Sequence, residues 1–216
     1  MAKLKILVAG FGPFAGVPNN PSGELAVRVA SSRRIASSGV RIHSTVIPTV
    51  YEEVFSTLSR LLKAEEPDAV LMFGLAGSTP FLRIETRATN VASSVYPDAT
   101  GEKLAHHSLI SGAPQFLSVR APARRLLHAA QSSGVKAKLS IDAGSYICNA
   151  AFFQCLDIAR HSSEPPLVTF VHIPWPRGSR RRKAGRRDLR PKMEALARAG
   201  EAILLALVSA LRTRRA

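Results

Sequence analysis

The sequence predicts an α/β fold in which helices cover both faces of a sheet, because strand-like and helix-like segments alternate along its 216 residues. Two of the strand-like segments, 69–74 and 166–173, are continuous apolar runs of the kind found in strands buried on both faces. The sequence contains no internal repeat and no long linker. We therefore expect a single domain over residues 1–216, with a basic loop at about 177–190 and a C-terminal helix at about 191–212.

The first half of the chain alternates between strand and helix patterns. Residues 3–9 are short and mostly apolar, and residues 40–47 alternate and are rich in β-branched side chains, so both favour strands. Ser22 has a side chain suited to the N-cap of the helix that follows. The predicted elements are a strand at 3–9, a helix at 22–32, a strand at 40–47, a helix from 48, a strand at 69–74 and an extended stretch at 81–91.

The second half continues the alternation. Pro191 stands where a proline suits the first turn of a helix, and an apolar stripe follows it at helical spacing. The predicted elements are a helix at 123–132, a weak strand at 135–141, a helix at 145–161, a strand at 166–173 and a last helix that begins near 191.

The charge balance is the one unusual feature of the composition. The formal net charge is +15, and nine basic residues with one acid, Asp188, fall between Arg177 and Lys192. Such a run favours an anionic partner, although a single basic loop is more often solvated or part of a contact between subunits.

Several classes of protein are disfavoured. No run approaches the ~20 consecutive apolar residues of a membrane span, so we expect a cytoplasmic protein with no membrane partner. Two cysteines, Cys148 and Cys155, make no disulfide framework, and the histidines lack metal-ligand spacing to them. No metal site is therefore expected.

A glycine- and proline-rich loop follows the first strand at residues 10–16. It lacks a Walker lysine, and its prolines and phenylalanines obstruct a phosphate cradle. Phe11 and Phe14 either anchor this loop to the core or form an apolar wall for a small ligand.

Cys148 is a candidate nucleophile. Gly144 and Ser145 mark a turn with an N-cap, which places Cys148 in the first turn of a helix. The terminal amides and the helix dipole there favour a thiolate. The alternative is a small buried hydrophobe, which describes most free cysteines and fits Cys155 well.

Two further residues are candidates for proton transfer. His172 ends an apolar strand just before a proline, and strand ends are where sites form in open α/β sheets, so it is either a core residue or a presented base. Glu85 follows a strand end and either orients an imidazole or forms an ion pair with Arg83 or Arg87.

Taken together, these residues resemble the pyroglutamyl peptidase type I (pyrrolidone carboxyl peptidase) family of cysteine peptidases. The motifs that carry the resemblance lie in the right order between residues 4 and 176. They are Gly10 to Gly16 with Asn20-Pro21, Gly74-Leu75-Ala76, Glu85 with Ala88 and Asn90, Pro97-Asp98 with Gly101, Gly112-Ala113-Pro114, Ala143-Gly144 with Cys148-Asn149, and His172 with Pro174.

The resemblance implies a three-layer α/β/α sandwich with an open, mostly parallel twisted sheet, assembled as a homotetramer or homodimer. It implies removal of an N-terminal 5-oxoproline from peptides through an acyl-enzyme, with no metal or organic cofactor. Cys148 is then the nucleophile, His172 the general base and acid, and Glu85 the carboxylate that orients His172. The implied substrate-binding residues are Phe11, Phe14, Asn20, Gly74 and Leu75, and amides of the 10–16 loop are candidate oxyanion donors.

The chain also departs from the family pattern. Thr86 stands where the family commonly has arginine directly after the glutamate, and Arg83 or Arg87 is a candidate substitute for that cation. Thr79 and Val95 also stand where the family commonly has arginine, and Asp142 stands where it has a small hydroxyl residue. A buried Asp142 would raise the pKa of the nearby thiol. The alternative function is a catalytically divergent family member with altered specificity, whose basic loop binds a polyanion such as nucleic acid.

Overall fold

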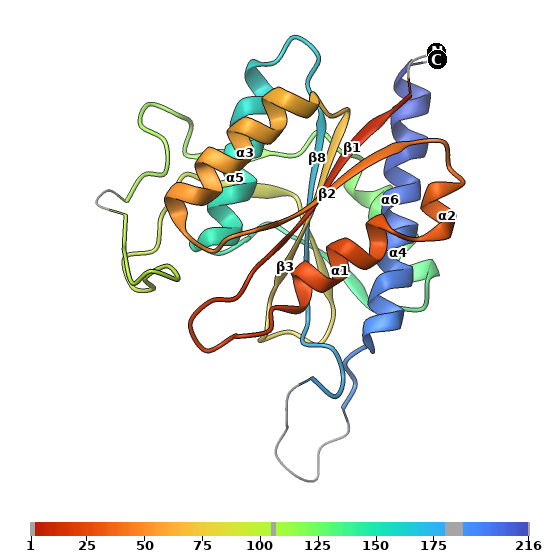
Figure 1. The fold of residues 1–216 in the computed structure, drawn as a ribbon, viewed down its shortest axis with the longest axis horizontal. Helices are drawn as coiled ribbons and strands as arrows, with labels where there is room; N and C mark the ends of the chain where they lie inside the picture. Colours follow the sequence, from red (N-terminus) through yellow and green to blue (C-terminus); the bar gives the residue numbers. More distant parts are fainter. Residues whose placement is uncertain (1–2, 105–106, 180–187, 216) are drawn as a thin grey trace.

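A six-stranded sheet forms the centre of the molecule in the computed structural model, which describes residues 3–104, 107–179 and 188–215 (Figure 1). The spatial order of the strands is β2 (Arg41–Ile47), β1 (Lys5–Phe11), β3 (Ala69–Leu75), β8 (Leu167–Ile173), β4 (Leu82–Glu85) and β7 (Ala137–Ser140). A separate antiparallel pair joins β5 (Arg87–Thr89) to β6 (Phe116–Ser118).

The sheet is mostly parallel, with one reversal. Strands β2, β1, β3 and β8 pair in parallel, and β4 pairs in parallel with β7. Only β4 and β8 are antiparallel neighbours among the described strands of this sheet, with Arg83 opposite His172. This reversal places the end of β4 alongside β8, so residues far apart in the sequence meet there.

Helices cover both faces of the sheet, as the sequence predicted (Figure 1). Because side chains alternate along a strand, Ile6 and Val8 of β1 face one apolar core while Leu7 and Ala9 face the other. The first core is covered by α1 (Pro21–Ala30), α2 (Arg33–Ala36), α4 (Ala123–Ser132) and α6 (Met193–Arg215). The second is covered by α3 (Tyr51–Glu65) and α5 (Ile147–His161).

The predicted elements agree with the structure within a few residues, with four differences. Helix α5 has Tyr146 at its N-cap position with no side-chain cap, in place of the N-cap expected at residues 144–145. Helix α1 has Asn20 as its N-cap in place of Ser22, because the Asn20 side chain accepts a hydrogen bond from the Ser22 N–H at 3.1 Å. The short elements α2 and β6 were not predicted, since three or four residues carry too little periodicity. The extended stretch at 81–91 is divided into β4 and β5.

The basic segment is described only in part. Six of its nine cations lie at 180–187, outside the described residues, so the expected polyanion contact stays a prediction. Within the described parts of the chain, no helix has the length and apolar character that crossing a membrane requires.

Candidate active site

Glu85 and His172 form a buried hydrogen-bonded pair on adjacent strands. The two side chains are 0% and 3% exposed, and Glu85 Oε1 lies 2.8 Å from His172 Nδ1. They reach each other because β4 and β8 are antiparallel, so Glu85 sits diagonally across from His172 on one face of the sheet. The Phe170 ring lies 4.9 Å from the imidazole and packs beside it. This pairing directs Nδ1 toward the carboxylate and leaves Nε2 for other chemistry.

Cys148 lies over the strand next to His172. It is the second residue of α5, in the first turn as expected, and it is half-buried. Gly74 is the register partner of His172, and a Cβ atom at Gly74 would stand only 2.8 Å from Cys148 Sγ. The backbone N–H groups of Leu75 and of Cys148 itself lie near enough to the sulfur to act to lower its pKa. The structure therefore gathers Cys148, His172 and Glu85 around the ends of β3, β8 and β4.

The protonation state of the thiol differs from the expectation of a resting thiolate. Burial raises the pKa of Cys148 to about 12, the Glu85 charge adds to the rise, and Arg83 and the two N–H groups oppose it. Burial also lowers the pKa of His172, against the opposing effect of Glu85. Burial thus outweighs the helix terminus, and it favours the neutral form of both the thiol and the imidazole.

Asp142 does not have the effect anticipated for a buried carboxylate. Its side chain is exposed and accepts a hydrogen bond from the Gly144 N–H at 2.8 Å. That bond supports the turn before α5, where Gly144 adopts a positive φ of 81°.

The two phenylalanines of the 10–16 loop have different positions. Phe11 is 2% exposed and packs 6.1 Å from the Phe170 ring, so it anchors the loop to the core. Phe14 is half-buried and stacks at a tilt on Tyr146, two residues before Cys148. Of the two, Phe14 is the one placed beside the start of α5.

Sequence reasoning missed an aromatic cluster next to the thiol. Tyr146 contacts Tyr51 edge-to-face at 6.1 Å and Tyr96 at 6.4 Å, and its hydroxyl donates to the Pro97 carbonyl at 2.9 Å. The Tyr51 hydroxyl is buried and makes no close hydrogen bond among the described residues, although the Ser93 backbone interacts with it and acts to lower its pKa. The tyrosine just before the candidate nucleophile was the signal available in the sequence.

Asn20 and the loop amides are occupied by internal hydrogen bonds. The Asn20 amide donates to the Gly12 carbonyl at 3.0 Å, so it fastens the loop to α1. The N–H groups of Phe11, Gly12 and Phe14 bond Ser22 Oγ, the Ile47 carbonyl and the Val17 carbonyl. These three amides already have partners, so the expectation of oxyanion donors from the loop rests on its other amides.

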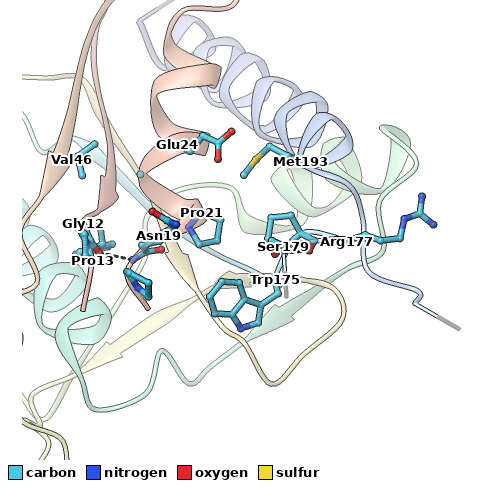
Figure 2. Close-up of a pocket in the computed structure, with 15 residues that line it drawn as sticks. Gly12, Pro13, Asn19, Pro21, Glu24, Val46, Trp175, Arg177, Ser179 and Met193 are labelled. Atoms are coloured by element: carbon cyan, nitrogen blue, oxygen red, sulfur yellow. Dashed lines mark hydrogen bonds between the residues drawn. The ribbon is translucent and has the colours of Figure 1, made fainter. Parts of the chain in front are cut away.

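A cavity of about 650 Å³ opens beside this loop, between the start of α1 and the start of α6 (Figure 2). Gly12, Pro13, Glu24, Trp175 and Met193 are among its lining residues. Neither Cys148 nor the Glu85–His172 pair lines it.

Two buried polar residues hold the site in place. Asn149 donates to the Thr89 and Val91 carbonyls and accepts from the Thr89 N–H, which ties the start of α5 to β5. Asp98 accepts from the Tyr51 N–H and from residues 100 and 102. Although burial acts in the opposite direction, these bonds hold the pKa of Asp98 below its ordinary value. No group of three or more metal-ligating side chains occurs among the described residues.

Replacement of Gly74 by alanine is expected to lower kcat/KM for the 5-oxoprolyl substrate that the resemblance implies at least about 10-fold. It should also destabilise the fold by about 1–3 kcal/mol. The added methyl group would meet both Cys148 Sγ and the buried Phe170 ring at 2.8 Å. Steady-state kinetics and thermal melting measure the two effects. Gly12→Ala is the control for stability, since its methyl would find nothing closer than 3.6 Å. Wild-type kcat/KM in Gly74→Ala would contradict the placement of the thiol.

Comparison with known proteins identifies relatives along most of the chain. The sequence profile of the family described as pyroglutamyl peptidase matches residues 4–212. A pyrrolidone-carboxylate peptidase of Thermococcus kodakarensis is 33% identical over 172 residues, covering 80% of this chain and 82% of that protein. Pyrrolidone-carboxylate peptidase 1 of Ralstonia nicotianae is 34% identical over 170 residues, covering 79% and 78%.

The fold is shared with solved structures. The pyrrolidone carboxyl peptidase of Thermococcus litoralis superposes with a TM-score of 0.89 at 24% identity, covering 98% of this chain and 96% of that one. The α/β architecture with a mostly parallel sheet is thus the architecture of that protein.

Proposed function

We propose, from the fact that the chain belongs to the pyroglutamyl peptidase family, that it removes N-terminal 5-oxoproline from peptides through Cys148, His172 and Glu85. The observation that carries the proposal is the buried Glu85–His172 hydrogen bond of 2.8 Å, with Cys148 lying over the strand that borders His172. In this proposal Cys148 is the nucleophile, His172 is the base beside it, and Glu85 is the carboxylate that orients the base.

The first half of the reaction forms an acyl-enzyme. Glu85 accepts the Nδ1–H of His172, so Nε2 takes the thiol proton as Cys148 Sγ attacks the carbonyl carbon of the 5-oxoprolyl residue. The negative charge on the carbonyl oxygen is stabilised by nearby N–H donors, for which Leu75 and Cys148 are the candidates. His172 then gives its proton to the leaving amine, and the C–N bond breaks.

The second half releases the product. Water enters beside the thioester, His172 takes its proton, and the hydroxide attacks the same carbonyl carbon. The C–S bond breaks, the Cys148 sulfur regains a proton, and free 5-oxoproline leaves. Each step uses the same imidazole, and no metal or cofactor takes part in the proposed sequence.

Selection of the lactam is assigned to the aromatic side chains beside the thiol. Phe14 and Tyr146 offer apolar faces to a small neutral ring. Tyr51 supplies a buried hydroxyl that makes no close hydrogen bond among the described residues and is near enough to Cys148 for the two groups to interact electrostatically. A charged α-amino group would have to be desolvated in the same place, which disfavours ordinary N-termini.

The test is to compare hydrolysis of chromogenic 5-oxoprolyl, prolyl and alanyl amides. We expect kcat/KM for the 5-oxoprolyl amide to exceed that for the other two by at least about 10²-fold. The prolyl amide is the matched control, because it keeps the ring and lacks the lactam carbonyl. Equal kcat/KM values for the prolyl and 5-oxoprolyl amides would contradict lactam specificity. A protein that hydrolyses none of the three amides would contradict the proposed peptidase activity.

A further inference from the structure

Arg83 belongs to the buried Glu85–His172 pair as a third charged group. It is the register partner of His172 across the β4–β8 pair, and it lies two residues before Glu85 on the same face of β4. Its Nε is 3.1 Å from Glu85 Oε1, and one terminal nitrogen is 3.3 Å from His172 Nδ1. With a side-chain exposure of 23%, the guanidinium is largely shielded from water. Arg87, the other candidate partner in the sequence, bonds the Ile141 carbonyl instead.

The donor and acceptor roles in this cluster follow from its chemistry. A guanidinium only donates and a carboxylate only accepts, so Nδ1 cannot serve both neighbours at once. The contact with Glu85 is shorter and pairs an N–H with a full negative charge, and it therefore determines that Nδ1 carries the proton. Arg83 then acts through its charge, because it shares Oε1 with the imidazole and supplies a positive partner for a carboxylate that is 0% exposed.

We propose that Arg83 is a positioning residue of this site, which holds Glu85 against His172 through its charge and sets the pH range in which Cys148 and His172 work. The proposal rests on the function proposed above, since it concerns the same site. The arginine lies at a position other than the one directly after the glutamate, where this chain has Thr86.

The direction of the effect follows from the charges around the two titrating groups. Glu85 and Arg83 face them from β4, Asp142 adds a negative charge near His172, and Tyr51 lies near Cys148 from α3. A nearby cation favours loss of a proton, and Arg83 accordingly lowers the pKa of both Cys148 and His172. Removing its charge should therefore shift both titrations toward higher pH. A residue with a purely structural role would weaken the site without moving its pH dependence in one direction.

The experiment measures the rate of Cys148 alkylation by iodoacetamide against pH, with the modified peptide quantified by mass spectrometry. In Arg83→Gln we expect the curve to move up by about one pH unit, so that alkylation at a given pH on its rising part is about 10-fold slower. The acidic limb of kcat/KM for the 5-oxoprolyl amide should move in the same direction. Cys155, which is fully buried, provides an internal comparison in the same digest.

Three variants separate charge from packing. Arg83→Lys retains the charge and should return the curve toward that of the wild type. Arg87→Gln removes a cation four residues away in the chain and should leave the curve unchanged. If Arg83→Gln does not fold, the alkylation curve of Glu85→Gln is compared with that of the double variant Arg83→Gln/Glu85→Gln. Both variants lack the buried carboxylate, so the double variant does not leave it without its cation.

Each outcome decides the matter. An unmoved curve in Arg83→Gln, or an equal shift in Arg87→Gln, would overturn the proposal, and so would Arg83→Lys behaving like Arg83→Gln. The alkylation readout needs no peptidase activity. A protein that hydrolyses no 5-oxoprolyl amide but shows the Arg83-dependent shift would thus refute the proposed function while upholding the role of Arg83.

Discussion

Cys148→Ser is expected to reduce kcat for a 5-oxoprolyl amide by about 10⁴-fold or more. Serine has nearly the shape of cysteine, so α5 and the contact over Gly74 should persist. Its hydroxyl is a far weaker acid and nucleophile than a thiol, and His172 is placed to serve a thiol that is itself hard to ionise. Single-turnover kinetics with circular dichroism would separate the chemical loss from any loss of folding.

Cys155→Ala is the matched control for this substitution. Cys155 lies on the same helix seven residues later, is fully buried, and packs in the apolar core under α3 and α5. Its replacement should cost about 1 kcal/mol of stability and leave kcat near the wild-type value. Full turnover by Cys148→Ser, or equal losses in both variants, would remove Cys148 from the proposed mechanism.

Glu85→Gln is expected to lower kcat by about 10²–10⁴-fold with a smaller effect on KM. The amide preserves the shape of the side chain but has no charge to stabilise the imidazolium that forms when His172 takes the thiol proton. It also offers Nδ1 either a donor or an acceptor, so the correct tautomer is no longer enforced. Arg83 would in addition lose its anionic partner, and thermal melting should register that loss.

A second histidine–glutamate pair in the chain serves as the control. Glu65 Oε1 lies 3.1 Å from His43 Nδ1, but the two side chains are 22% and 38% exposed and lie on other elements. Glu65→Gln should leave kcat and KM unchanged, since exposed pairs contribute little. Wild-type kcat in Glu85→Gln would show that the buried carboxylate plays no part in orienting the base.

The sequence was sufficient for the longer elements, and it named residues of the candidate site that the structure brings close together. Apolar runs such as 69–74 predict buried strands whichever strands they later pair with. The position of Cys148 in a first helical turn follows from the turn at residues 144–145. The antiparallel pairing of β4 with β8 was not predicted, because strand order depends on contacts between distant segments. Glu85 and His172 were grouped only through the family resemblance.

The electrostatics of the site could not be predicted from the order of residues. The helix terminus suggested a thiolate, whereas burial raises the pKa of Cys148 to about 12, and burial depends on the packing of several elements. The same holds for Arg83 and Arg87. Both were candidates to pair with Glu85, and only the register of β4 against β8 brings Arg83 into the pair.

The position of β8 in the middle of the sheet also determines when the proposed catalytic residues can come together during synthesis. β8 lies between β3 and β4, yet it is the last strand to emerge from the ribosome. Without β8, the strand order separates β2, β1 and β3 from β4 and β7, and Glu85 lacks the histidine that it bonds in the complete chain. In the proposed mechanism, an unfinished copy would hold the thiol without its proton acceptor, and peptide cleavage would begin only once β8 has joined the sheet.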